Sequence, residues 1–275
     1  MQNNIVISGS SDIGFEFIKN RCSVGDNVIG TYRDENAKDK LKDYCSHVIP
    51  LDLFSKDSID NFIKYIANKK ILWDKILFCP CQTFPYKSFF ECDFKEWDES
   101  FKLNSTHQLE LLHKLHRFRK TNSKVIFFAG GGSNGAVNKF SAYTSGKIHL
   151  TKMIELLDFE NKDMTFSIIG PGWVNTKNHL LALKYAEKNS EKYITTKRFL
   201  ESPKGATPIE EVVRSINWLF DQKKNIVGGR NFSTAFDPWG EDHPLNSDLL
   251  KKLDEDENIY KLRRFGNYLF PKKRY

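Results

Sequence analysis

Tyr143 and Lys147 stand four positions apart and combine two side chains that can do acid–base chemistry. A free phenol has a pKa of about 10, which is too high for easy proton exchange near neutrality. An ammonium group one helical turn away favours the phenolate and lowers that pKa. The pair therefore predicts a poised acid and base for an alcohol or carbonyl oxygen. Such pairs also arise on solvated helix faces, so the prediction depends on the elements that position them.

Those elements follow a regular alternation of short apolar runs and longer helical patterns. Strands are predicted at 4–8, 27–32, 47–51, 75–78, 124–129 and 164–169, and helices at 13–22, 56–69, 95–119, 142–158 and 208–220. This alternation predicts a single-domain α/β fold of the Rossmann type, with a doubly wound parallel sheet. The domain is predicted to span 1–236, with the polar stretch 177–205 as a substrate lid. Residues 237–275 are predicted to pack on the domain or on a partner subunit.

The length, apolar content, cysteines and charge of the chain exclude several classes of protein. The chain has 275 residues, which suits one large domain, and no run of 18 apolar residues that would span a bilayer. The first residues enter a strand without a signal-peptide pattern. Five cysteines at irregular spacing indicate reduced thiols and a cytoplasmic protein, and the spacing Cys79-Pro80-Cys81 predicts no metal site. The net charge of +7 is spread along the chain, which favours a solvated surface over a nucleic-acid interface.

A turn rich in small residues joins the first predicted strand to the first helix. It reads Ser8-Gly9-Ser10-Ser11-Asp12-Ile13-Gly14. Small residues there let backbone amides approach a pyrophosphate, and the helix N-terminus adds partial positive charge. The turn therefore predicts a dinucleotide site.

With this turn and the Tyr-x-x-x-Lys pair, residues 3–235 resemble the short-chain dehydrogenase/reductase family. That family's turn reads Thr-Gly-x-x-x-Gly-x-Gly. Counted back from Gly14, Ser8 takes the first glycine position and Asp12 the second; alternatively, one residue is missing. An aspartate near phosphates is unfavourable unless its carboxylate turns away or caps the helix.

The resemblance also implies a cofactor preference. Members that use NAD place an acid at the end of the second strand to hold the ribose, whereas this chain has Tyr32 followed by Arg33. An arginine can pair with a 2′-phosphate, so NADP is predicted and NAD is the less favoured alternative. Asp52 matches the family's adenine-contacting aspartate. Cys79-Pro80-Cys81-Gln82 stands where the family has Asn-Asn-Ala-Gly.

The resemblance assigns the chemistry to four residues. Tyr143 matches the acid/base, Lys147 the residue that also holds the nicotinamide ribose, and Asn104 the helix residue that holds a relay water. The family's catalytic serine lies thirteen residues before the tyrosine, and Gly130 stands there instead. Ser133 is the nearest replacement; the alternative is polarisation by backbone amides of the glycine loop. Ser141 is predicted to cap the tyrosine helix.

A last matching segment follows the sixth predicted strand. In the family, the loop that corresponds to Pro171-Gly172-Trp173-Val174-Asn175-Thr176 contacts the nicotinamide amide and the pyrophosphate. Residues 225–230 resemble the turn into a final strand. The resemblance also implies a homodimer or homotetramer built on the helices near 95–119 and 142–158.

The sequence thus predicts an NADP-dependent oxidoreductase that interconverts a carbonyl and an alcohol in a small molecule, with sugar-derived compounds among the candidate substrates. Two alternatives stay open. One is a nucleotide-sensing binding protein that keeps the cofactor and has lost the chemistry. The other is a sugar-nucleotide-modifying enzyme of the extended family, for which the chain is short.

Overall fold

The computed structural model describes residues 1–240 and 245–264. Within them, parallel strands form one seven-stranded sheet in the order β3-β2-β1-β4-β5-β6-β7. The strands are β1 (Asn3–Ile7), β2 (Asn27–Tyr32), β3 (His47–Pro50), β4 (Trp73–Phe78), β5 (Arg119–Phe128), β6 (Met164–Gly170) and β7 (Asn231–Ser233). The predicted Rossmann-type fold is confirmed.

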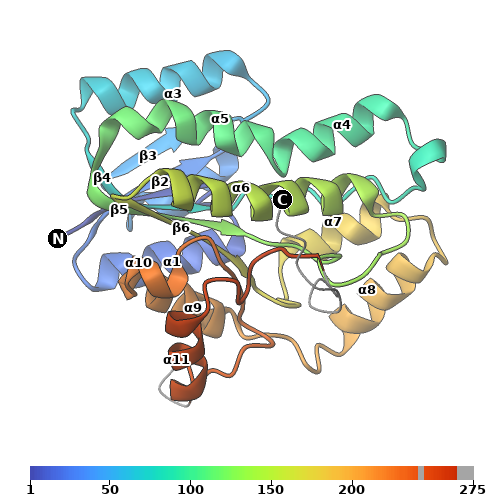
Figure 1. The fold of residues 1–275 in the computed structure, drawn as a ribbon. Coiled ribbons are helices and arrows are strands. Elements are labelled where there is room, and N and C mark those ends of the chain that lie inside the picture. Colours follow the sequence, from blue (N-terminus) through green and yellow to red (C-terminus); the bar gives the residue numbers. More distant parts are fainter. Residues whose placement is uncertain (241–244, 265–275) are drawn as a thin grey trace, which may run out of the picture.

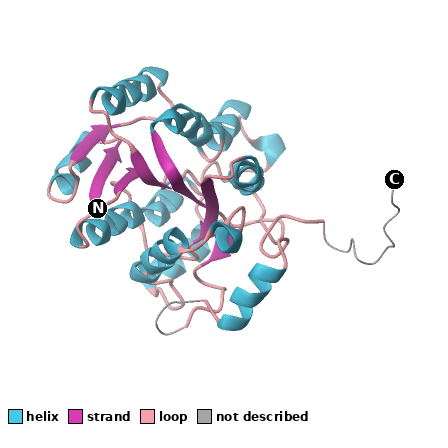
Figure 2. Ribbon diagram, turned by 60° about the vertical axis from the view of Figure 1, so that its left-hand side comes forward, coloured by secondary structure: helices cyan, strands magenta, loops and turns pink. Residues whose placement is uncertain are grey.

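Helices cover both faces of this sheet (Figures 1 and 2). One face carries α3 (Lys56–Asn68), α4 (Phe94–Leu103), α5 (Thr106–Leu115) and α6 (Ser141–Glu160). The other carries α1 (Asp12–Ser23), α2 (Lys38–Lys42), α9 (Ile209–Asp221), α10 (Lys224–Val227) and α11 (Ser247–Glu255). Burial of near-continuous apolar strands such as β1 between these layers forms the two halves of the core.

The predicted helix 95–119 is wrong in two respects. The structure divides it at Asn104 and Ser105 into α4 and α5, and β5 already begins at Arg119. The Asn104 amide donates to the carbonyl oxygen of Ser100 at 2.8 Å, and the Ser105 hydroxyl donates to that of Phe101 at 2.6 Å. Such side-chain bonds compete with the helical ladder and end α4 at this point.

The polar stretch 177–205 contains two helices, α7 (Lys177–Tyr185) and α8 (Glu191–Glu201), which follow the carboxyl end of β6 (Figure 1). Tyr86, Ala182 and Ala186 form a small separate apolar cluster here. Further on, Leu245 and Leu253 are buried in the same core cluster as α9. The part of the predicted C-terminal extension at 241–244 and 265–275 lies outside the described residues.

Candidate active site

The strand order reverses between β1 and β4, which lie side by side although β2 and β3 separate them in sequence. In open α/β sheets, ligands bind beyond the carboxyl ends of strands at such a switch point. The β1–α1 turn, the segment after β4, the glycine loop after β5 and the loop after β6 all start from this edge. The fold therefore brings together the segments in which the sequence placed candidate site residues.

The β1–α1 turn is tight and consists of small residues. Ser8 has φ +56°, a conformation that glycine adopts more easily, and its amide donates to Thr31 Oγ1 at 2.8 Å. Ser11 caps α1 by accepting from the amide of Gly14 at 3.2 Å. A Cβ on Gly14 would stand 2.9 Å from the carbonyl oxygen of Ser8, and one on Gly9 would stand 3.3 Å from that of Val6. At positions 9 and 14, therefore, any residue other than glycine would force neighbouring atoms of the turn to move.

Asp12 and Ile13 form the first turn of α1, where backbone amides have no partner within the helix. The Asp12 carboxylate does not cap α1. Its Oδ2 accepts from the backbone amide of Lys177 at 2.8 Å and so joins the N-terminus of α1 to that of α7. Thr176 is the N-cap residue of α7, and its side chain makes no capping hydrogen bond. The N-terminus of α1 suits an anionic group such as a pyrophosphate, whereas the Asp12 carboxylate already accepts from the first amide of α7.

The end of β2 holds both a cation and an acid. Arg33 is exposed, and among the described residues no side chain pairs with it. The phenol of Tyr32 hydrogen-bonds to the Glu35 carboxylate, which also accepts from Lys38 Nζ at 2.6 Å. The hydrogen bond from Lys38 is the main cause that lowers the pKa of Glu35. An acidic residue, Glu35, therefore does lie near the end of β2, three positions after Tyr32, and its carboxylate is already paired with Lys38.

Asp52 and the loop after β6 complete the predicted cofactor side. Asp52 Oδ1 accepts from the amide of Phe54 at 3.0 Å, which orders the turn after β3. Gly172 has φ +77°, and a Cβ there would stand 2.7 Å from the Cβ of Ala235. Pro171 is partly exposed, whereas Val174 is buried.

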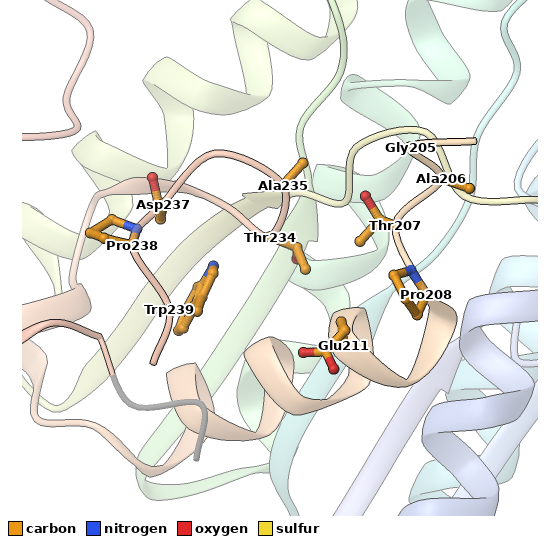
Figure 3. Close-up of a pocket in the computed structure, with 10 residues that line it drawn as sticks. All are labelled: Gly205, Ala206, Thr207, Pro208, Glu211, Thr234, Ala235, Asp237, Pro238 and Trp239. Atoms are coloured by element: carbon orange, nitrogen blue, oxygen red, sulfur yellow. The ribbon is translucent and has the colours of Figure 1, made fainter. Parts of the chain in front are cut away.

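A cavity of about 390 Å³ lies behind this loop. Figure 3 shows its walls, which come from the segment before α9, from α9 itself and from the segment after β7. Thr207 and Ala235, the neighbours of Gly172, belong to this wall, and Tyr143 does not. The cavity is therefore separate from the candidate acid/base.

Tyr143 and Lys147 lie in the first half of α6 and are both buried, with 8% and 1% of their surface exposed. Lys147 Nζ donates to the carbonyl oxygen of Phe128 at 2.9 Å and lies 5.9 Å from the centroid of the Tyr143 ring. Burial lowers the pKa of Lys147. The two side chains are neighbours, as their spacing predicted, and the ammonium is held by the end of β5.

The expected lowering of the Tyr143 pKa is wrong for this structure. Burial of the phenol raises the pKa of Tyr143 well above its ordinary value, and a hydrogen bond with the Cys81 side chain adds to the rise. A buried phenolate loses the solvation that water would give it, and the Lys147 ammonium is directed at the Phe128 carbonyl instead. A phenol in these surroundings keeps its proton at neutral pH.

The Tyr143 ring fills the place beside Gly130. A Cβ on residue 130 would stand 2.5 Å from Tyr143 Oη, so a serine cannot occupy this position without displacing the phenol. Ser133 Oγ donates to the carbonyl oxygen of Gly130 at 3.3 Å. The Ser133 hydroxyl therefore bonds within the glycine loop, to the residue that lies against the Tyr143 ring.

Asn104 is fully buried and clamps the segment after β4. Its Oδ1 accepts from the amide of Gln82 at 3.3 Å, and its Nδ2 donates to the Gln82 carbonyl oxygen at 2.6 Å. A Cβ on Gly146 would stand 3.0 Å from the Asn104 Cβ, which shows how closely α4 and α6 approach. Asn104 therefore lies beside the helix that carries Tyr143 and Lys147.

The prediction that Ser141 caps the tyrosine helix is wrong, and two residues near Tyr143, Cys81 and Lys192, are not predicted by the sequence. Phe140, not Ser141, is the N-cap residue of α6, and Ser141 Oγ accepts from Trp97 Nε1 at 2.9 Å. The sequence predicts Cys81 as a reduced thiol outside any metal site and as part of the segment in place of Asn-Asn-Ala-Gly, but not as a neighbour of Tyr143, which the structure shows it to be. The sequence predicts the polar stretch 177–205 as a lid and assigns no role to Lys192, whereas the structure places Lys192 Nζ, on α8, 5.5 Å from the Phe140 ring centroid.

The order of the strands defines a Rossmann-type α/β protein. The family model described as Enoyl-(Acyl carrier protein) reductase matches residues 7–234. The chain belongs to the short-chain dehydrogenase/reductase family, and an oxidoreductase function comes with that membership. Among curated proteins, none matches the sequence.

Several solved structures share the fold. A short-chain dehydrogenase/reductase from Saccharomyces cerevisiae is 17% identical with a TM-score of 0.74, covering 85% of this chain and 96% of its own. A short-chain dehydrogenase from Shigella flexneri in complex with NADP is 15% identical with a TM-score of 0.69, over 85% and 96% of the two chains. An actinorhodin polyketide ketoreductase with NADPH is 16% identical with a TM-score of 0.72, over 84% and 95%.

Proposed function

We propose that the protein is an NADP-dependent reductase that converts a small carbonyl compound to the alcohol, with Tyr143 as the proton donor. The observation that carries the proposal is the burial of Tyr143 beside Lys147 at the switch point of the sheet. A buried phenol with a raised pKa keeps its proton until a substrate oxygen accepts it.

The chain's own residues divide the work. Tyr143 holds the proton, and Lys147, bonded to the Phe128 carbonyl, supplies the nearby positive charge that stabilises the phenolate after transfer. Asn104 fixes the segment after β4 and, as in the family, takes part in proton relay. Ser133 or the amides of its glycine loop polarise the carbonyl.

The residues at the edge of the sheet fit a dinucleotide. The cradle of Ser8, Gly9, Ser11, Asp12 and Ile13, which a Cβ on Gly14 would fill, is joined by the Asp12–Lys177 bond to the start of α7, where Thr176 is the N-cap residue. Arg33 would hold a 2′-phosphate, Asp52 the adenine, Lys147 the nicotinamide ribose, and Pro171, Gly172 and Val174 the nicotinamide end. When bound, the cofactor supplies the hydride.

The test combines binding and turnover. Purified protein is titrated with NADPH and NADH by fluorescence, and NADPH consumption is then followed with a panel of aldehydes and ketones. The proposal expects tighter binding of NADPH and consumption with at least one carbonyl compound. Binding without turnover on any member of the panel would contradict it.

A nucleotide-sensing binding protein is the second candidate. The contact between Tyr143 and Gly130 favours it, because the phenol fills the space where the family's serine would stand. This candidate predicts cofactor binding that Tyr143→Phe leaves unchanged and no carbonyl turnover.

The proposal extends to assembly and location. We place the protein in the cytoplasm, and within 1–240 and 245–264 no helix is long and apolar enough to cross a membrane. We propose a homodimer or homotetramer through α4, α5 and α6. Phe94 on α4 and Phe159 on α6 are 66% and 86% exposed, which suits helices that meet a partner. Light scattering of the purified protein would reveal the assembly.

A further inference from the structure

Lys192 on α8 is enclosed by aromatic rings. Its Nζ lies 5.6 Å from the ring centroid of Tyr86, 5.5 Å from that of Phe140 and 5.3 Å from that of Trp173. The three rings come from the segment after β4, the residue before α6 and the loop after β6. Ring faces attract an ammonium through their negative quadrupole charge, and the attraction is stronger where the ammonium is shielded from water.

The same ammonium has no carboxylate partner among the described residues. Lys139, in the wall of the same cavity, differs because it pairs with Glu187 at 3.3 Å. Burial lowers the pKa of Lys192, which shows that its surroundings disfavour the unpaired charge. A desolvated cation gains most from an anion that enters its site, because that anion supplies the missing charge.

Lys192 lies near the candidate acid/base, with the Phe140 ring between them; Tyr143 itself does not line the cavity beside Lys192. Phe140, one of its rings, lies 4.7 Å from Tyr143 between ring centroids. Cys81 lies near both Lys192 and Tyr143. Lys192 and its three rings line a cavity of about 780 Å³, large enough for a small molecule.

We propose that Lys192 binds an anionic group of the substrate, a carboxylate or a phosphate, while Tyr86, Phe140 and Trp173 hold its apolar body. The substrate class is then an anionic carbonyl or alcohol compound. That the substrate reacts at a carbonyl or alcohol group rests on the proposed function. That Lys192 binds an anion can be tested by binding measurements, whether or not the protein turns over a carbonyl.

The test uses matched ligands in calorimetric titrations, with and without NADP⁺. Phenylpyruvate carries a carboxylate, its methyl ester does not, and phenyl phosphate offers the other anion. Lys192→Met removes the charge and keeps the length, Lys192→Arg keeps the charge, and Lys188→Met is the control. Lys188 lines the same cavity but is exposed, and it contacts no aromatic ring of the described residues.

We expect at least one anion to bind more tightly than the ester, and the tighter anion identifies the group. One charge-assisted contact is worth about 1.5–3 kcal/mol, so Lys192→Met should weaken that anion roughly ten- to a hundredfold and leave the ester unchanged. Lys192→Arg should keep most of the affinity, and Lys188→Met should change it by less than about threefold.

Three results would overturn the inference. They are equal binding of acid and ester by the wild type, no binding of either anion, and full retention of anion affinity by Lys192→Met. An equal loss for acid and ester would show instead that Lys192 only fastens α8 to the rings. Anion binding through Lys192 without carbonyl turnover would contradict the proposed function and leave this site standing.

Discussion

Tyr143 Oη packs against the Cα of Gly130 so closely that a Cβ on residue 130 would stand 2.5 Å from it. The glycine is therefore not a simple loss of the family's serine, because the phenol has taken the space. Donors that polarise a substrate carbonyl must come from elsewhere in the loop, where Ser133 Oγ bonds to the Gly130 carbonyl oxygen.

Gly130→Ser should damage the protein rather than restore a family feature. Overpacking of a filled site costs about 1–3 kcal/mol and would shift the Tyr143 ring. We expect a lower melting temperature and a lower turnover. Gly131→Ser is the matched control, since a Cβ there meets nothing within 4 Å. A rise in turnover for Gly130→Ser would show that the position still accepts a serine.

Ser133→Ala tests the replacement for that serine. If the Ser133 hydroxyl polarises the carbonyl, its loss should lower the catalytic rate by about one to three decades and leave NADPH affinity unchanged. Ser145→Ala is a suitable control, because Ser145 Oγ donates to carbonyl oxygens of its own helix, those of Ser141 at 2.7 Å and Ala142 at 3.1 Å. An unchanged rate for Ser133→Ala would assign the role to the loop amides.

Arg33→Ala tests the choice of cofactor. A contact between the guanidinium and a 2′-phosphate is worth about 1.5–3 kcal/mol, so NADPH affinity should fall roughly ten- to a hundredfold while NADH affinity stays the same. Fluorescence titrations of both cofactors measure this. Arg117→Ala, an exposed arginine in the turn before β5, is the control. Equal wild-type affinities for the two cofactors would rule the role out.

The raised pKa of Tyr143 predicts a different dependence on pH for carbonyl reduction and for alcohol oxidation. A group with a raised pKa keeps its proton below that pKa, so Tyr143 causes no loss of carbonyl reduction between about pH 6 and 9. Alcohol oxidation needs the phenolate and should still be rising near pH 10. Cys81→Ala removes one cause of the rise and should move the oxidation profile to lower pH. A plateau of oxidation near neutrality would contradict the assignment.

Some of this architecture follows from local patterns and some does not. Apolar runs such as 75–78 predicted the strands, and their alternation with helices predicted the sheet, because burial between two helical layers requires such runs. The break at Asn104 depends on two side-chain bonds to backbone carbonyls, which spacing does not reveal. The short polar helices α2 and α11 have weak local signals.

The candidate site shows the same division. The neighbourhood of Tyr143 and Lys147 follows from one helical turn, whereas the direction of the Tyr143 pKa depends on burial by other segments. The rings around Lys192 come from three separate parts of the chain. Only the assembled fold brings them together.

The most direct test compares the turnover of wild-type protein and Tyr143→Phe on one carbonyl substrate with NADPH. Phenylalanine keeps the ring packed against Gly130 and Phe140 but removes the exchangeable proton. We predict a fall in turnover of at least about a hundredfold with unchanged NADPH affinity, since general acid catalysis contributes at least that much. A Tyr143→Phe variant that retains the wild-type rate would contradict the account.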